Sequence, residues 1–372
     1  MNVVVLSQRG ASGGPADQLA YSAWSEAENV LVEVGGARLG LLDVHRHHPR
    51  VKLRRVAGRG LRRIAGSHRV LPARSDGLLE PLDVRPGEAD HLILMAHGAW
   101  EVPLVERLGR LRRSAKTISV WMPEVWPSEL DDRLAYEGYD MVDHVFVGIR
   151  EVVDRFAELV PNADVHCLPP AVDVVTFGGP DPEPNRNIAV LGIGRREPTQ
   201  HRRILEWAAA NQELYLYDTL DGKAVSWRQH RDAVANWYRQ SRMAVCNYGK
   251  HDRPQEIGGL RIVPGRLFEG LAAGSILIGM PPDEENQRQL VGEVVVESTE
   301  TTELETLLDK YNDPESGRRM RLRNASLAAR RHDWAHRWRD VFQILDLPQP
   351  AGLDERLDLL TCRADEIDNR LG

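Results

Sequence analysis

Cysteine is scarce in this sequence, and long apolar runs and an excess of positive charge are missing. The three cysteines, Cys167, Cys246 and Cys362, form no CxxC pair, so a disulfide framework is excluded and buried, reduced thiols are expected. No apolar run approaches the roughly 20 residues of a membrane span. The net charge of −7 argues against a general polyanion binder. The first residues lack the basic flank and cleavage site of a signal peptide, so we expect a cytoplasmic protein.

Several motifs of well-known enzymes are also missing. The sequence has no GxSxG nucleophile elbow, no P-loop and no HExxH helix. The histidines of HRHH (45–48) could bind a transition metal, but no set of partners follows at a suitable spacing. We therefore expect no metal site.

Short β-branched runs that alternate with helical patterns are the main feature present, and they predict parallel sheets covered by helices on both faces. The strand candidates lie at 2–7, 91–98, 115–123, 143–149, the start of 187–211, 213–218, 243–248, 275–280 and 293–298. The Pro- and Gly-rich stretch 177–187 interrupts the pattern and predicts a linker between two α/β halves. Ligands of such sheets bind at the carboxyl ends of the strands, so we expect a site in a cleft between the halves.

Four stretches in order carry a resemblance to a known family: VHCLPPAVDVVTF (165–177), VLGIGRREPTQHRRIL (190–205), GRLFEGLAAGSILIG (265–279) and NASLAARRHDWAHRWRDVF (324–342). Together they resemble the family 4-like group of GT-B glycosyltransferases, nearest to its branch with an Arg-x-Phe-Glu motif. The resemblance implies an α/β fold of two Rossmann-like domains facing a central cleft. Residues 1–178 would take the acceptor, 186–345 would take the nucleotide sugar, and 346–372 would form a helical extension.

The same resemblance implies the reaction. A sugar would move from a nucleoside diphosphate sugar to an acceptor hydroxyl, with retention of configuration, without metal and with no cofactor besides the donor. The alternative is a catalytically inactive module of this fold that binds a nucleotide sugar or a glycan. Its main support is Arg261, which stands where the family's usual pattern has a glutamate eight positions before Glu269. An arginine there could instead meet a carboxylated sugar or a phosphate.

Glu269 and Arg266 carry the strongest implied binding roles. A carboxylate at position 269 could accept hydrogen bonds from both ribose hydroxyls of the donor. Arg266 would either bind the diphosphate or hold Glu269 through an i, i+3 pair. The GLAAG stretch (270–274) is expected to let a helix amino terminus approach the diphosphate.

The turn at 192–203 supplies arginines that could stabilise the departing diphosphate. Arg196 and Arg202 are the catalytic candidates and Arg195 a binding candidate. The resembled family commonly has a lysine several residues after its arginine, and here Arg202 or Arg203 would have to replace it. A solvated basic helix start remains the ordinary alternative.

The first half contributes candidates at predicted strand ends. Gly13 and Gly14 allow close backbone approach to a phosphate or the acceptor, or form a plain βα turn. His97 would line the sugar site and act in catalysis, or be an ordinary buried histidine. Trp121 could stack on a sugar and Glu124 could bind an acceptor hydroxyl, although such tryptophans more often pack in a core. Asp173, by contrast, is expected to be structural.

Residues 44–75 hold ten Lys or Arg and no Asp or Glu. Such a bias in an acidic chain fits either a solvated loop or a site for an anionic acceptor. The acceptor could be a lipid phosphate at a membrane surface, a sugar phosphate or a nucleic acid.

Overall fold

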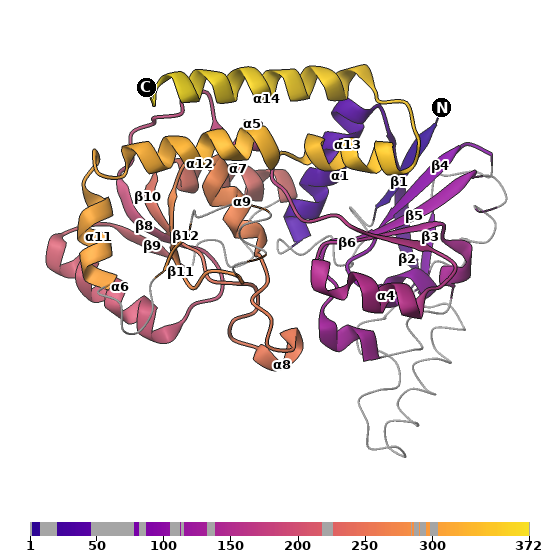
Figure 1. Ribbon diagram of the computed structural model, residues 1–372, viewed down its shortest axis with the longest axis horizontal. Helices are drawn as coiled ribbons and strands as arrows, with labels where there is room; N and C mark the ends of the chain where they lie inside the picture. Colours follow the sequence, from indigo (N-terminus) through magenta and orange to yellow (C-terminus); the bar gives the residue numbers. More distant parts are fainter. Residues whose placement is uncertain are drawn as a thin grey trace, which may run out of the picture. The chain divides into compact units, whose positions relative to one another are not determined.

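The computed structural model describes most of the chain (Figure 1). The described residues are 2–7, 21–45, 78–81, 87–104, 112, 115–131, 138–217, 226–283, 285, 290, 295–297 and 304–371. Two predicted features, the turn at Gly13 and Gly14 and residues 46–75 of the basic segment, lie outside them. The chain divides into two compact units, Met1–Pro169 and Pro170–Gly372.

The first unit contains a seven-stranded sheet with the order β3-β2-β1-β4-β5-β6-β7. Its strands are β1 (Val3–Ser7), β2 (Arg38–His45), β3 (Leu78–Pro81), β4 (His91–Met95), β5 (Thr117–Met122), β6 (His144–Val147) and β7 (Asp164–Cys167). Its main helices are α1 (Ser22–Gly35) and α4 (Val153–Leu159), and a 3₁₀ helix, η3 (Ala99–Leu104), follows β4. Neighbouring strands are parallel except β2 and β3, and every residue of β1 and β4 is buried. Such apolar central strands belong to a sheet covered on both faces.

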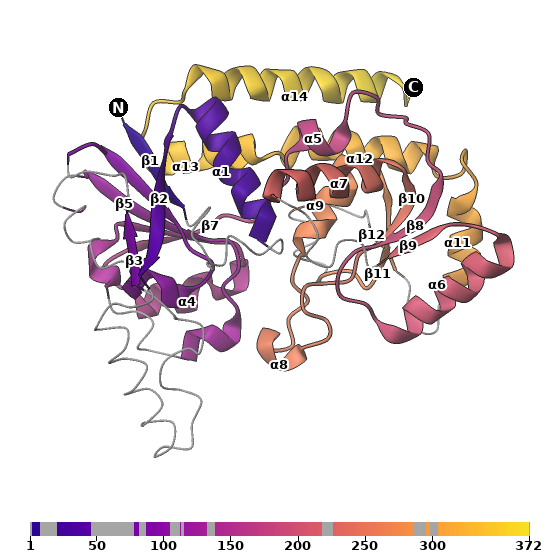
Figure 2. The same cartoon turned by 180° about the vertical axis from the view of Figure 1, so that it is seen from behind.

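The second unit contains a five-stranded parallel sheet with the order β12-β11-β10-β8-β9. Its strands are β8 (Ile188–Gly192), β9 (Tyr215–Tyr217), β10 (Ser241–Val245), β11 (Ile276–Gly279) and β12 (Val295–Glu297). Its helices up to this point are α5 (Val174–Gly178), α6 (Pro198–Asn211), α7 (Trp227–Arg239), α8 (Pro254–Ile257), α9 (Gly265–Ala272) and α11 (Leu304–Asn312). Figure 2 shows α6 and α11 on one face of this sheet and α7 and α9 on the other. The fold class predicted from the sequence is therefore confirmed.

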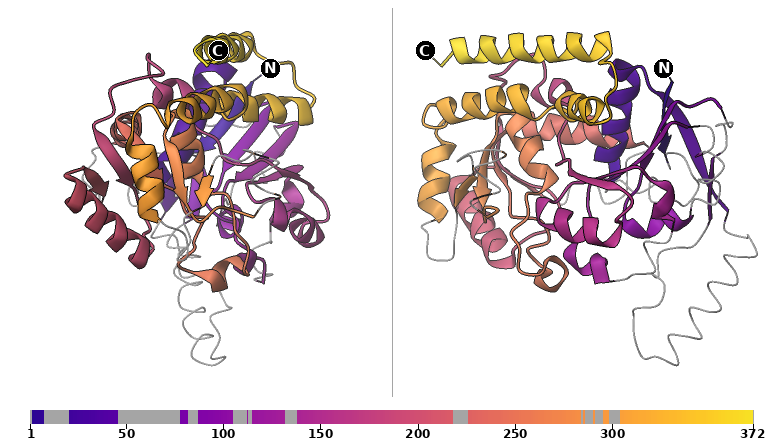
Figure 3. Two further views of the ribbon diagram at one scale, coloured as in Figure 1. Left: turned by 60° about the vertical axis from the view of Figure 1, so that its left-hand side comes forward. Right: turned by 45° about the vertical axis from the view of Figure 1, so that its right-hand side comes forward.

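Three helices complete the second unit: α12 (Arg318–Arg331), α13 (Trp334–Ile344) and α14 (Ala351–Asn369). The basic stretch 317–345 is thus a pair of helices, and it breaks where Asp333 accepts the Ala335 N–H at 2.8 Å and caps α13. Helix α14 stays alongside α12 in both views of Figure 3. None of the helices in the described part of the chain is both long and apolar enough to cross a membrane.

A buried charge cluster joins the ends of this unit. Arg356 of α14 lies 2.8 Å from Asp333 and 2.7 Å from Asp173, which caps α5 by accepting the Thr176 N–H. Burial opposes ionisation of Asp173, but the Arg356 charge and the bonds from Thr176 hold the pKa of Asp173 below its ordinary value.

This cluster explains where the second unit begins. It holds α5 on the second unit, and α5 also packs on α7 and α9. The division therefore falls between Pro169 and Pro170, earlier than the boundary that the sequence suggests at 178.

The three cysteines are free thiols, but only Cys246 is fully buried. Burial raises the pKa of the Cys246 thiol to about 12, so it stays protonated. Cys167 is half-buried and Cys362 is exposed on α14, which corrects the expectation that all three are buried. A helix surface accepts a cysteine without a core position, and the sequence carries no signal for this.

Candidate functional site

The carboxyl edge of the second sheet begins with a glycine turn after β8. Gly192 ends the strand, and Gly194 has a φ of +82°, a conformation that favours glycine. Helix α6 then starts with Glu197, whose carboxylate accepts the N–H groups of Thr199 and Gln200 at 3.0 and 2.5 Å. Because a carboxylate of the chain already occupies this helix start, an anionic ligand must find other donors here.

Arg266 lies directly against this turn. A Cβ atom added to Gly194 would sit 1.8 Å from Nη2 of Arg266, so only glycine leaves room for the guanidinium. Among the described residues, no hydrogen bond or ion pair involves the Arg266 side chain. The structure thus brings together two segments, 190–205 and 265–279, that the sequence assigned separately to one ligand, with an unneutralised cation between them.

Glu269 is buried three residues further along α9, and its partner comes from another helix. Nη1 of Arg231 on α7 lies 2.5 Å from Oε1 of Glu269, and both side chains are almost inaccessible to solvent. The guanidinium of Arg231 also stacks over the Phe177 ring, 4.5 Å from its centroid. Arg231 therefore holds Glu269 in place, which is the role suggested as one alternative for Arg266.

The boundaries of α9 correct another expectation. The helix runs from Gly265 to Ala272, so Arg266 and Glu269 lie inside it, and the GLAAG stretch forms its end rather than a helix start. Gly270 faces β11, where an added Cβ would meet the Leu277 side chain at 2.3 Å, and Gly274 follows the helix with a φ of +68°. These glycines serve packing and helix termination and do not approach a phosphate through a helix amino terminus.

The other arginines of the turn separate into two groups. Arg195 pairs with Asp252 at 2.9 Å, and Arg203 pairs with Glu305 of α11 at 2.6 Å, on the face of α6 that packs against that helix. Arg196 is exposed, with its guanidinium 5.6 Å from the centre of the Tyr217 ring. Arg202 is also exposed and makes no hydrogen bond or ion pair with any residue described. Arg202 is thus available to a ligand, whereas Arg195 and Arg203 have structural partners.

An amide network fixes the neighbouring strand ends. Asn247, just after β10, donates to Gln200 of α6 at 3.0 Å and accepts the Met280 N–H at 2.8 Å. Gly279 has a φ of +154°, and an added Cβ would lie 2.5 Å from the Asn247 oxygen. The network holds β10, β11 and α6 together at this edge. A polar residue directly after an apolar strand was its only sequence signal.

Arg261 lies in the loop before α9 and is exposed. Its backbone N–H donates to the Asp283 carboxylate at 3.1 Å, and its guanidinium lies 5.6 Å from the centre of the Tyr248 ring. Its position is therefore fixed by the loop, while its charge stays accessible.

The described candidates of the first unit lie at or just after the ends of the neighbouring strands β4 and β5. The His97 backbone N–H donates to Glu101 at 2.8 Å, and its ring packs edge-on to Tyr21 at 4.4 Å between centroids. Trp121 is completely buried in β5 and packs on Trp24, so its ring serves the core in this structure. Glu124 follows β5 and is exposed.

One group of side chains in the first unit has donor atoms that could hold a metal ion. His144, Asp164 and His166, on the neighbouring strands β6 and β7, place one ligand atom each within 4.8 Å of one another. The two imidazoles are already 3.4 Å apart, a contact that needs no ion. Burial, and next the neighbouring His144, lower the pKa of His166, which favours the neutral form of that ring. The sequence expectation of no metal site rested on local spacing, which cannot detect a group formed across two strands.

Comparisons with known proteins agree with this arrangement. Residues 187–343 match a family described as glycosyl transferase-like. HepE from Anabaena, solved with UDP and glucose, superimposes with a TM-score of 0.51 at 11% identity, covering 93% of this chain and 99% of HepE. Its complex with UDP-glucose gives a TM-score of 0.50 with the same identity and coverage. Sucrose-phosphate synthase from Thermosynechococcus elongatus gives 0.48 at 11% identity, covering 93% of this chain and 98% of the synthase.

The likeness to the two HepE complexes establishes the fold, which is that of the GT-B glycosyltransferases. No curated protein matches the chain in sequence. The family match over the second unit, together with the fold, supports a glycosyltransferase.

Proposed function

We propose that this protein moves a sugar from a nucleoside diphosphate sugar to an acceptor hydroxyl, with the nucleotide held at the carboxyl edge of the second sheet. The observation that carries the proposal is the contact of Arg266 with Gly194, beside the buried Glu269. Both segments lie inside the region that matches the glycosyl transferase-like family.

Glu269 would accept the ribose hydroxyls in this scheme. Its pairing with Arg231 supports the role, because a carboxylate fixed by a buried guanidinium is oriented before the ligand arrives. The ionised carboxylate is also the form that accepts two hydroxyl donors.

Positive charge for the departing diphosphate would come from arginines. Arg266 is placed at the glycine turn, and Arg196 and Arg202 are exposed on the segment that follows it. Guanidinium groups fit phosphate oxygens in a fixed fork and are most effective where negative charge develops in the transition state. This supply of cations supports a reaction that needs neither a metal nor a cofactor besides the donor. Retention of configuration is proposed on the family resemblance.

The acceptor would bind to the first unit, with His97 and Glu124 as candidate contacts. Residues 44–75, most of which lie outside the described residues, remain a candidate for an anionic acceptor or a membrane surface on charge alone. Arg261 would contact the sugar or a phosphate through its accessible charge.

The test begins with donor binding and then asks for turnover. UDP-, GDP-, ADP- and dTDP-sugars should be compared by thermal shift, starting with UDP-glucose because the HepE structures hold UDP and UDP-glucose. The accepted donor should then be incubated with a panel of acceptors, and free nucleoside diphosphate should be measured. Stabilisation together with nucleotide release supports the proposal. Binding without release from any donor would favour the inactive binding module, and no stabilisation by any donor would contradict both.

A further inference from the structure

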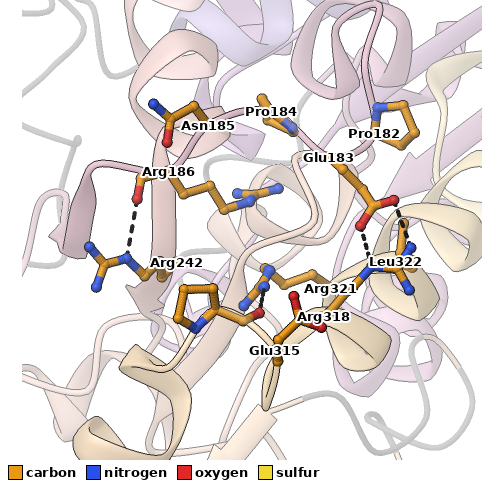
Figure 4. Close-up of a pocket in the computed structure, with 11 residues that line it drawn as sticks. Pro182, Glu183, Pro184, Asn185, Arg186, Arg242, Glu315, Arg318, Arg321 and Leu322 are labelled. Carbon is orange, nitrogen blue, oxygen red and sulfur yellow. Dashed lines mark hydrogen bonds and ion pairs between the residues drawn. The ribbon is translucent and has the colours of Figure 1, made fainter.

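A cavity lies at the amino-terminal edge of the second unit's sheet, opposite the carboxyl edge proposed for the donor. Its volume is about 250 Å³, slightly below the roughly 300–1,000 Å³ of typical small-molecule sites. It is lined by the chain segment that leads into β8, by Arg242 of β10, by Pro314 and Glu315, and by the start of α12 (Figure 4). Four arginines contribute to its wall: Arg186, Arg242, Arg318 and Arg321.

Two of these arginines are neutralised within the protein. Arg318 pairs with Glu183 at 2.6 Å, and Arg242 pairs with Glu213 at 3.2 Å. The remaining acidic residue of the wall, Glu315, is exposed and forms no ion pair with any described arginine.

The other two arginines form no ion pair with any described carboxylate, although the charges of Asp181 and Glu183 act on Arg186 and those of Glu183 and Glu315 act on Arg321. Arg186 donates to the backbone carbonyls of Ser241 at 2.6 Å and Ala273 at 2.7 Å, which take up part of its five N–H groups but leave its charge. Arg321 donates to the Pro314 carbonyl, while its Nη1 is buried and meets no acceptor in the part of the chain that is described. Buried donors are nearly always satisfied, so the unpaired nitrogen leaves this cavity-lining guanidinium without full compensation.

The electrostatics of the cavity also favour a bound anion. Burial, and next the charge of Arg321, lower the pKa of Arg186 to about 9. Burial is also the main reason that the pKa of Arg321 is lowered. Helix α12 begins here without a side-chain cap, so the positive end of a 14-residue helix adds to the field. Each of these costs would be relieved by an anion.

We propose that this cavity binds a small anion through a phosphate group, held by Arg321 and Arg186. A phosphate offers several oxygens to the guanidinium forks and carries enough charge to neutralise both. The cavity is separate from the donor edge, because β8 and β10 run between them and five strand residues span roughly 16 Å. The site is thus additional to the proposed transfer reaction and does not depend on it.

The test is calorimetric titration of the full chain with inorganic phosphate in a low-salt chloride buffer. Arg321→Gln should weaken phosphate binding about tenfold or more, because a charged hydrogen bond is removed. Arg323→Gln is the matched control, since it removes the same charge from an exposed position on the same helix. Arg266→Gln controls for phosphate at the donor edge. The Arg323→Gln variant should bind within about twofold of the wild type. Any phosphate bound at the donor edge is the part that is lost in Arg266→Gln.

A second variant, expected to bind phosphate more tightly, keeps the test decisive even if Arg321→Gln does not fold. Glu183→Gln should tighten phosphate binding about threefold, because it releases Arg318 from a half-exposed pair that contributes little to stability. Titration with glycerol 3-phosphate in parallel distinguishes a free phosphate from a phosphate ester, since only an ester uses the rest of the cavity. Equal affinity of the Arg321→Gln and Arg323→Gln variants, loss of binding only in Arg266→Gln, or no heat from the wild type would each overturn the proposal.

Discussion

The arginines of the second unit differ in whether they have partners within the protein. We call Arg231, Arg337 and Arg356 the tied arginines, because buried carboxylates or backbone carbonyls accept their hydrogen bonds and none of the three lines the phosphate cavity. We call Arg202 and Arg266 the open arginines, because neither makes a hydrogen bond or ion pair with any described residue. The open ones belong to the two segments that meet at the carboxyl edge of the sheet. The comparison teaches that arginine content alone does not locate a phosphate site; the open arginines are among those proposed to bind the donor diphosphate.

The largest expected effect comes from removing the tied arginine with two carboxylate partners. Arg356→Met would leave Asp173 and the fully buried Asp333 without their cation. We expect the free energy of unfolding to fall by about 4–5 kcal/mol, measured by urea unfolding. The control is the open-arginine variant Arg202→Met, which should change stability by less than about 0.5 kcal/mol. Equal effects of the two variants would remove the distinction between tied and open arginines.

A somewhat smaller loss is expected at the Arg231–Glu269 pair. Glu269→Met alone would leave a buried guanidinium unpaired and lower the free energy of unfolding by about 3–4 kcal/mol. The double variant Arg231→Met, Glu269→Met removes both charges and should regain most of that stability.

Nucleotide binding by the double variant then tests whether Glu269 binds the ligand or only stabilises the fold. The stable double variant should still bind the donor nucleotide about 1.5–3 kcal/mol more weakly than the wild type, since the ribose has lost its acceptor. Calorimetry would measure this. A double variant that is stable and binds nucleotide normally would show that Glu269 serves only the fold.

The open arginine Arg266 should show the opposite behaviour. Arg266→Gln is expected to weaken nucleoside diphosphate binding by about 2 kcal/mol and to leave the free energy of unfolding within about 0.5 kcal/mol. The nucleoside, which lacks the diphosphate, should bind both proteins equally. If nucleoside binding falls as much as nucleoside diphosphate binding, Arg266 does not act on the phosphates.

The smallest expected effect is a pH dependence of stability that comes from His332, which lies beside the tied arginine Arg337. Arg337 donates to the Pro170 carbonyl at 3.2 Å, and its guanidinium also lies 3.4 Å from Nδ1 of His332. Burial, and next the charge of Arg337, hold the pKa of His332 well below its ordinary 6.5. The folded state therefore binds fewer protons than the unfolded state below pH 6.5, and stability falls as the pH is lowered through that value.

Between pH 6.5 and 5.5 this histidine should cost about 1 kcal/mol, and His332→Gln should reduce the slope by that amount. Urea unfolding at several pH values above 5.5 measures it without interference from carboxylates, which titrate lower. An unchanged slope would place the titration elsewhere, first at His336, whose pKa burial also lowers.

The sequence predicted the strands whose own residues form a continuous apolar run and missed the strands in which that run is interrupted or very short. Strands β8 and β11 were found because their residues are apolar and buried throughout. Strand β2 was missed, since Gly40 and Asp43 interrupt its apolar pattern, and β3 is a four-residue strand at the sheet's edge.

The candidate site shows the same limit. The glycine turn and the Arg-x-Phe-Glu stretch could be identified locally, and their meeting at Gly194 agrees with the shared ligand expected for them. The start of α9 was predicted too late in the chain. The spacing of Leu267, Phe268 and Leu271 is already helical and places Glu269 inside the helix. Arg231 could not be predicted at all. It lies 38 residues before Glu269 on another helix, and only tertiary packing brings the two together.

The position of Arg356 also has a consequence for the order in which the protein is made. Asp173 leaves the ribosome 183 residues before the arginine that neutralises it, and Asp333 leaves 23 residues before. Until Arg356 emerges, neither carboxylate can be buried without a large desolvation cost. Translation therefore sets the earliest time at which the second unit can close, and the first unit, complete at residue 169, is free to fold ahead of it.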